Sequence, residues 1–352
     1  MTQQQLARYF QRVKTNFNAV QTENSYTGDI HLRLAEKQVV LRLSSAALKN
    51  TCMPSLRHAL AKENPIRPNN ASGVFYYWQD EIANYYPFPT NRADRLDIWK
   101  HESEFAKIFI PVHGQYFKAH HYVENEVYRC VPKSDRIDFA HTTHPLKFLL
   151  HDWAQRNNLL FIHSAAVEID GCGNLISSVG GKGKSTLAIS SLLAGHQYAG
   201  DDYVLLDKNA CAHMIYGSGY LNQDMLEKLP ALKQYIIGAD EKRNNKTLID
   251  LSPYSRRFKS PIKIHMILFP NLVTGRQASV VIGESAKAVG QMVMSSARQN
   301  GARFDRDFMQ TACRAIAHLP VYQINLTSDI FANIRALEQF VNRREQQNVS
   351  GK

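Results

Sequence analysis

The sequence lacks most features of a secreted or membrane protein. Its cysteines are odd in number and scattered, without a C-x-x-C pair, so we expect reduced thiols rather than disulfides. It has no leading apolar segment and no run of about eighteen apolar residues. We therefore expect a cytoplasmic protein that does not act at a membrane. The cysteines are Cys52, Cys130, Cys172, Cys211 and Cys313.

Signatures of zinc sites and of nucleic-acid binding are also missing. The 14 histidines include His141-Thr-Thr-His144 and His120-His121, but no H-E-x-x-H motif or cysteine–histidine grouping accompanies them, so no structural zinc is expected. The formal charge of +11, from 42 basic and 31 acidic residues, favours anionic ligands, including acidic peptides. Because the basic residues are dispersed and no helix-turn-helix pattern occurs, we do not expect a nucleic-acid partner.

The length of 352 residues predicts two domains, and the 44% apolar and 21% charged content is typical of a globular chain. Residues 1–140 are expected to form a β-rich, mostly antiparallel domain that binds substrate or a partner. Leu6, Phe10, Val13 and Phe17 recur at helical spacing and predict a leading amphipathic helix. Further expected elements are a helix at 54–63, a β-hairpin at 30–34 and 39–43, and strands at 74–78, 105–112, 116–123 and 127–131.

Residues 141–352 mix helical and strand patterns, which predicts an α/β domain within a chain that is α+β overall. A helix over residues 145–155 is expected to lead into an apolar strand that ends at His163. The later expected elements are a glycine-rich turn at 216–221, strands at 262–269, 278–282 and 321–326, and helices at 224–235, 285–299, 305–317 and 328–347.

The strongest motif lies between Phe161 and Leu206, where a strand, a glycine-rich loop and a helix follow one another. Glycine reaches backbone angles closed to other residues, so successive N–H groups of the loop can point at phosphate oxygens. The positive N-terminal end of the helix adds to this field. In such a loop the lysine reaches the outer phosphates and the next hydroxyl binds a divalent metal. The motif therefore predicts a nucleoside triphosphate with Mg²⁺, bound by Gly180, Gly181, Lys182, Gly183, Lys184, Ser185 and Thr186.

An acid pair, Asp201-Asp202, follows the loop helix after the turn Gly195–Gly200. A helix of about ten residues rises about 15 Å, enough to return the next strand beside the loop. Adjacent carboxylates on an extended chain point in alternate directions. One can therefore hold Mg²⁺ while the other faces an incoming hydroxyl.

The order and spacing of these residues resembles the HPr kinase/phosphorylase family, which shares its nucleotide-binding fold with ATP-dependent phosphoenolpyruvate carboxykinase. His163 lies twenty-one residues before Lys184, Gly195-His196 follows the helix, and the acid pair begins seventeen residues after the lysine. The resemblance covers about 45 of the 352 residues firmly and the remaining C-terminal third loosely.

The resemblance implies a mixed-sheet P-loop kinase domain and, since related kinases assemble, a homo-oligomer. It places Lys184 and Ser185 on phosphate and metal, Asp202 on the metal, and Asp201 as base for the acceptor hydroxyl, with His163 tuning that base. The two aspartates could exchange these roles. HPr kinases carry Glu where this chain has Thr186. Relatives that phosphorylate hydroxyls other than that of HPr are therefore the better comparison.

A second family resemblance of the loop can be excluded, and one alternative to a kinase stays open. The loop also looks like that of ParA/MinD ATPases, but their extra lysine would fall at Val179, so that family is excluded. The sequence therefore predicts a kinase that moves the γ-phosphoryl group of ATP to a serine-like hydroxyl of a peptide, protein or small metabolite. Lys246, Arg256 and Arg257 are candidates for additional cations, but exposed basic residues on a loop are more often plain solvated charge. The alternative is a regulatory module that binds ATP and transfers nothing.

Overall fold

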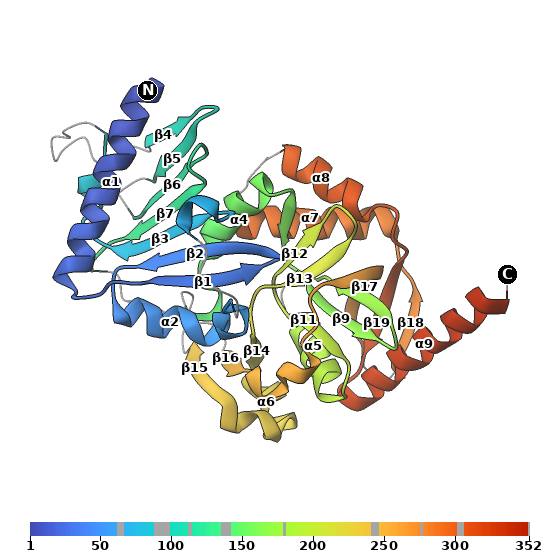
Figure 1. The fold of residues 1–352 in the computed structure, drawn as a ribbon. Coiled ribbons are helices and arrows are strands. Elements are labelled where there is room, and N and C mark those ends of the chain that lie inside the picture. Colours follow the sequence, from blue (N-terminus) through green and yellow to red (C-terminus); the bar gives the residue numbers. More distant parts are fainter. Residues whose placement is uncertain are drawn as a thin grey trace. The chain divides into compact units, whose positions relative to one another are not determined.

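The computed structural model describes residues 1–61, 67–87, 99–111, 115–134, 142–178, 181–240, 246–274, 277–300 and 306–350. The chain divides into two compact units, Met1–Asn157 and Asn158–Lys352 (Figure 1). This division falls later than the expected one at residue 140, because helix α4 belongs to the first unit. In α4 the Trp153 ring packs edge-on against Phe75, and its indole N–H donates to the Ser72 carbonyl at 2.9 Å.

The first unit contains a mixed, mostly antiparallel sheet with the strand order β1-β2-β3-β7-β6-β5-β4. The pairs β2–β3 and β3–β7 are parallel, and the other neighbours are antiparallel. The elements are α1 (Gln3–Glu23), β1 (Asp29–Leu34), β2 (Lys37–Leu43), α2 (Ala46–Leu56), β3 (Val74–Gln79), β4 (Trp99–Glu102), β5 (Ala106–Ile110), β6 (Phe117–His121), β7 (Glu126–Val131) and α4 (Lys147–Arg156).

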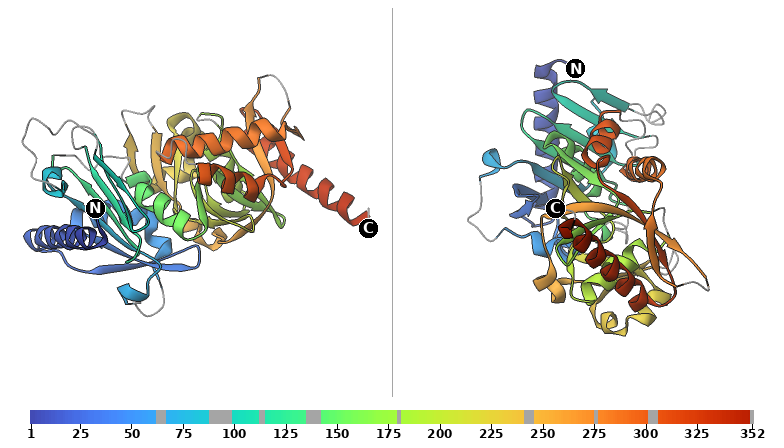
Figure 2. Two further views of the ribbon diagram at one scale, coloured as in Figure 1. Left: turned by 90° about the horizontal axis from the view of Figure 1, so that it is seen from above. Right: turned by 90° about the vertical axis from the view of Figure 1, so that its right-hand side faces the viewer.

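Helix α1 covers one face of this sheet, as Figure 2 shows. The ring of Phe17 meets Tyr76 and Trp78 edge-on, and Phe10 stacks on Tyr128 at 5.4 Å between ring centroids. Burying each such ring contributes about 1.5–3 kcal/mol. The predicted amphipathic helix and the predicted hairpin of β1 and β2 are confirmed.

The second helix of this unit differs from the prediction, because α2 begins well before residue 54. Ser45 caps its N-terminus by accepting a hydrogen bond from the Leu48 N–H at 3.2 Å. Pro54 lies near the end of α2, not at its start. A serine cap is the stronger signal for a helix start, and the prediction gave too much weight to the proline.

The second unit is built on a larger mixed sheet in the order β11-β9-β10-β17-β13-β12-β8, with β19 paired to β17 and β18 to β19. The elements are β8 (Leu159–Ile162), β9 (Ala165–Ile169), β10 (Cys172–Ile176), α5 (Lys184–Leu193), β11 (Gln197–Gly200), β12 (Val204–Asp207), β13 (Cys211–Met214), β14 (Ser218–Asn222), α6 (Gln223–Lys228), β15 (Ile236–Asp240), β16 (Lys246–Asp250), β17 (Ile262–Leu272), β18 (Ser279–Ile282), α7 (Ser285–Asn300), α8 (Arg306–Ile316), β19 (Val321–Leu326) and α9 (Ile330–Ser350).

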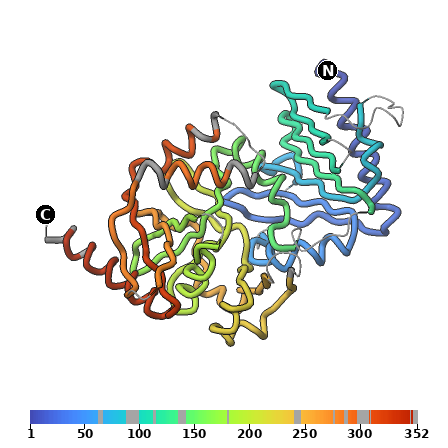
Figure 3. The backbone as a smooth tube through the Cα atoms, turned by 180° about the vertical axis from the view of Figure 1, so that it is seen from behind, coloured from blue at the N-terminus to red at the C-terminus, as the bar shows by residue number. Residues whose placement is uncertain are grey.

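Strand β17 joins the parts of this sheet (Figure 3). Its first residues pair with β13, its middle with β10 and its last residues with β19. At Gly173 of β10 an added Cβ would lie 1.9 Å from the Lys263 carbonyl oxygen, so only glycine fits where the two strands meet. Through β17, strands β8, β10 and β11 therefore belong to one continuous sheet.

A smaller sheet in the order β14-β16-β15 lies beside α5 and corrects two predictions. Residues 216–221 were expected to form a turn, but Ser218–Asn222 is strand β14. One helix was expected over 224–235, but α6 ends at Lys228 and a 3₁₀ turn starts at Pro230. Proline cannot donate the backbone bond that continues a helix, which explains this break.

The described cysteines are free thiols, and Cys52, Cys130 and Cys172 are buried. Within the ranges given above, no helix is both long and apolar enough to cross a bilayer.

The pH dependence of stability tests the burial of His120 on β6. His120 is 2% exposed, and burial lowers the pKa of its imidazole to about 4. The pKa of histidine in an unfolded chain is about 6.5. The unfolded chain therefore binds more protons below that pH. The first unit should lose stability as the pH falls from about 6.5 to about 4, by up to about 1.4 kcal/mol per pH unit from this side chain.

Tryptophan emission in urea titrations measures this effect in the first unit alone, since Trp78, Trp99 and Trp153 all lie there. We expect His120→Gln to reduce the pH slope by about 1 kcal/mol per pH unit. The exposed His318 of the second unit supplies the control variant His318→Gln, which should keep the wild-type slope. If His120→Gln also keeps the wild-type pH slope, burial of His120 does not contribute to the pH dependence of stability.

Candidate functional site

The glycine-rich loop leaves β10 beside β17 and enters α5 at Lys184. The predicted order of strand, loop and helix is confirmed. Gly181 and Gly183 have φ angles of 82° and 93°, in the left-handed region that favours glycine. An added Cβ at Gly183 would lie 2.7 Å from Leu326 Cδ1, whereas Gly181 has no such neighbour within 4 Å. Gly180 lies outside the described residues.

The ammonium group of Lys184 is at the centre of a polar cluster. Lys184 is 6% exposed and donates to the carbonyl oxygens of Asp201 at 3.0 Å and Asp202 at 3.3 Å. It also donates to Oδ1 of the Asp202 carboxylate. The acid pair therefore lies beside the loop lysine, as the helix length predicts.

The Asp202 carboxylate lies between Lys184 and His163. His163 Nε2 is 2.8 Å from Asp202 Oδ1, and the imidazole is almost fully buried. The side chain of Asp202 is 18% exposed, compared with 6% for that of Lys184. A ligand that approaches the cluster can therefore reach Asp202. The structure joins His163 to Asp202, whereas the resemblance implied that it acts on Asp201.

The Asp201 carboxylate faces other partners and is 5% exposed. Its Oδ1 accepts from the Tyr198 hydroxyl at 3.3 Å, and its Oδ2 accepts from the Tyr220 backbone N–H at 3.1 Å. Burial, and then the charge of Asp201, raise the pKa of Tyr198 well above its ordinary value, so the phenol remains a donor. Asp201 thus fixes the turn after β11 and connects it to β14.

Helix α7 supplies contacts that sequence reasoning missed. Ser295 Oγ lies 3.0 Å from His163 Nδ1, and the His163 backbone N–H donates to Ser296 Oγ at 3.0 Å. The Tyr203 ring lies against the imidazole, with centroids 5.2 Å apart. Tyr203 follows the acid pair and could have been noticed in the sequence. The serines are more than 130 residues from His163, and no sequence signal connects them to it.

The other basic residues that the sequence analysis named make their contacts elsewhere in the second unit. His196 Nε2 is 2.8 Å from Glu338 Oε1, which ties the end of α5 to α9. The Arg257 guanidinium lies beside Gly195, at the end of α5 opposite the loop, so Arg257 does not supply charge at the phosphates. Arg256 is exposed on the same 3₁₀ turn. The Lys246 ammonium lies 4.6 Å from the centre of the Tyr220 ring.

The donors around the loop fit a nucleotide with Mg²⁺. Among the described residues, no group of three or more His, Cys, Asp and Glu side chains forms a metal cage. Mg²⁺ does not need one, since it keeps several waters and binds through one or two carboxylates and substrate phosphates. The partly exposed Ser185 hydroxyl in the first turn of α5 and an adjacent aspartate are suitable oxygen donors.

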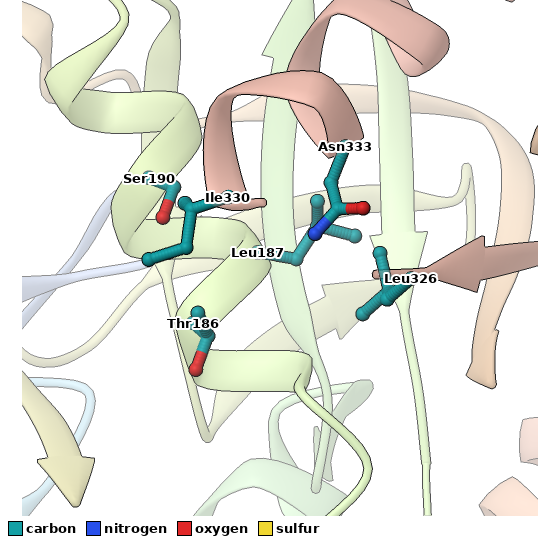
Figure 4. Close-up of a pocket in the computed structure, with 6 residues that line it drawn as sticks. All are labelled: Thr186, Leu187, Ser190, Leu326, Ile330 and Asn333. Atoms are coloured by element: carbon teal, nitrogen blue, oxygen red, sulfur yellow. The ribbon is translucent and has the colours of Figure 1, made fainter. Parts of the chain in front are cut away.

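A small cavity lies between α5, the end of β19 and α9 (Figure 4). Its volume is about 10 Å³, far below the range of about 300–1,000 Å³ that is usual for ligand pockets. We therefore do not assign the nucleotide to it. Its lining residues are Thr186, Leu187, Ser190, Leu326, Ile330 and Asn333.

Comparison with known proteins gives little further information. No protein-family model matches this sequence, and no curated protein matches it. Among solved structures, the chain is similar to the one titled "Structure of the Hpr(Ser) kinase/phosphatase from Coxiella burnetii". The identity is 14%, the match covers 53% of this chain and 98% of that chain, and the TM-score is 0.27. At that TM-score the similarity carries no argument about this protein.

Substitution of the loop glycines tests the contact between Gly183 and Leu326. Both Gly181→Ala and Gly183→Ala should lose about 1–2 kcal/mol of unfolding free energy, because alanine is strained at these φ angles. Gly183→Ala should lose about 1–3 kcal/mol more, since its Cβ overlaps Leu326. Urea unfolding followed by far-UV circular dichroism measures both. Leu326→Ala should recover part of the extra loss at Gly183, and equal losses at the two glycines would contradict the contact.

A double-mutant cycle tests the pair of Lys184 and Asp202. Lys184→Met leaves the carboxylate without its ammonium partner, so we expect a loss of about 1–3 kcal/mol in unfolding free energy. Asp202→Asn should cost less once Lys184 is gone, with a coupling energy of about 1–3 kcal/mol. Lys208→Met removes an exposed lysine and is the control. Additive losses would show that the two groups do not interact.

Proposed function

We propose that this protein is an ATP-dependent kinase that transfers the γ-phosphoryl group to a serine-like hydroxyl of a peptide, protein or small metabolite. The observation that carries the proposal is the cluster of Lys184, Asp202 and His163 next to the glycine-rich loop. It brings together a cation for phosphates, a carboxylate for the acceptor proton and an imidazole bonded to that carboxylate.

The loop and its helix would bind the nucleotide. Backbone N–H groups around Gly181 and Gly183 and the N-terminal end of α5 would surround the phosphates. The Lys184 ammonium would lose its contact with the Asp202 carboxylate and bind the outer phosphates instead. Ser185 would hold Mg²⁺ together with phosphate oxygens, and the ion would neutralise charge on the transferred group. Phosphoryl transfer depends mainly on such positioning and neutralisation.

We assign proton removal to Asp202 rather than Asp201, an alternative that the sequence left open. Asp202 is the more exposed of the two and contacts His163, whereas both oxygens of Asp201 accept bonds from Tyr198 and Tyr220. The hydroxyl proton passes to the Asp202 carboxylate as the acceptor oxygen bonds to the γ-phosphorus. The bond from that phosphorus to the β,γ-bridging oxygen breaks and releases ADP.

All residues of the cluster belong to the second unit. We therefore propose that the first unit, which supplies none of them, binds the acceptor or a partner.

The test uses magnesium and γ-labelled ATP with a pool of amino acids, hydroxyl metabolites and cell-extract proteins. Wild type and the control Lys208→Ala should label one acceptor. Lys184→Ala should lose nucleotide affinity, because the phosphates lose their cation. Asp202→Asn should still bind ATP but transfer phosphate about 10²–10⁴-fold more slowly, because it lacks the base.

Three outcomes decide between the alternatives. Loss of transfer in Asp202→Asn with a smaller loss in Asp201→Asn supports the assignment. The reverse pattern returns the role of base to Asp201. Binding of ATP without label in any acceptor would contradict the kinase and leave the regulatory module.

A further inference from the structure

His163 is held on several sides by residues that are distant in sequence. Its Nε2 faces Asp202, its Nδ1 faces Ser295, and its backbone N–H donates to Ser296. The Tyr203 ring packs against the imidazole. These contacts leave the ring little freedom to turn over, so its two nitrogens keep different partners.

The first anchor is Ser296, whose hydrogen-bond direction is fixed. Ser296 is fully buried, and its hydroxyl donates to the Met292 carbonyl at 2.9 Å. The Oγ of Ser296 is therefore left as an acceptor for the His163 N–H. This bond fixes the backbone where β8 ends. Met292 and Val293, each 1% exposed, hold α7 in the core, so the anchor is rigid.

The second anchor is Ser295, which acts on the ring. A carboxylate only accepts hydrogen bonds, so the neutral imidazole must carry its proton on Nε2 to donate to Asp202. Nδ1 then has a lone pair, and the Ser295 hydroxyl, 3.0 Å away, is the donor that it requires. A ring with the proton on Nδ1 would instead turn an unprotonated Nε2 toward the carboxylate.

We propose that Ser295 is a positioning residue that holds His163 in the Nε2–H tautomer and thereby orients Asp202 as the base. This rests on the proposed function only for the role of Asp202, since the tautomer itself is a property of the resting protein. Ser295 does not touch the reacting atoms and acts through His163.

The tautomer can be measured without any activity assay. The ¹⁵N chemical shifts of a neutral imidazole differ between protonated and unprotonated nitrogens, and the His163 signals are assigned by their loss in His163→Gln. Spectra are recorded at about pH 8.5, where an ordinary imidazole is neutral. We expect the Nε2–H form in wild type and in Ser295→Thr, which keeps the hydroxyl. Ser295→Ala should show a mixture of tautomers.

The control is Gln291→Ala, which removes an exposed side chain one turn away on α7 and should keep the wild-type spectrum. An Nδ1–H ring in wild type, or the same spectrum in Ser295→Ala as in wild type, would overturn the proposal.

Kinetics then separate this proposal from the proposed function. With the acceptor found above, Ser295→Ala should lower kcat about tenfold, the effect of one lost hydrogen bond, and leave KM for ATP within about twofold. Ser295→Thr should restore kcat. Unchanged kcat in an active kinase would contradict the role of Ser295. A shifted tautomer in a protein without kinase activity would contradict only the proposed function.

Discussion

The buried ammonium group of Lys184 is the constraint on which the site depends. A buried charge is costly unless it is hydrogen-bonded and paired. Here the partners are the Asp202 carboxylate and the carbonyl oxygens of Asp201 and Asp202. The glycine loop, the first turn of α5 and the turn after β11 must therefore come together. In the proposed reaction, triphosphate oxygens replace Asp202 as the partner of the ammonium. Nucleotide binding would then leave the carboxylate with its contact to His163 and free to act as a base.

Sequence predicted the parts of the site that lie within one local pattern. Helix α5, strand β19 and the position of the acid pair beside Lys184 follow from spacing and periodicity, which the short connections preserve. The partners of each aspartate do not follow from these signals. These partners depend on the direction in which the Asp201–Asp202 turn faces. That direction is set by the hydrogen bonds that Asp201 accepts from the Tyr198 hydroxyl and from the Tyr220 N–H of β14.

The remaining differences between the predicted and the observed elements arise where local sequence signals are weak or compete with one another. Residues 216–221 contain glycines, which favour a turn, yet β14 forms because its backbone pairs with β16 and because Gly219 lets it pack against Ile189 of α5. Pro54 was given more weight than the cap at Ser45. The contacts of α7 with His163 join residues more than 130 positions apart and depend on tertiary packing alone. The loop could thus be recognised in the sequence, but the contacts of the individual carboxylates required the structure.

Strand β17 also determines how the second unit can open. Since it carries the hydrogen bonds of β10, β13 and β19, neither part of the large sheet can separate without exposing strand edges of the other. Hydrogen exchange at its central amides should therefore require unfolding of the whole unit, in contrast to units in which separate segments open independently. Asp202 lies in the turn between β11 and β12, and Val204 of β12 pairs with Ile162 of β8, the residue before His163. The alignment of His163 with Asp202 therefore depends on the pairing of β8 with β12, and it is retained as long as these two strands stay paired.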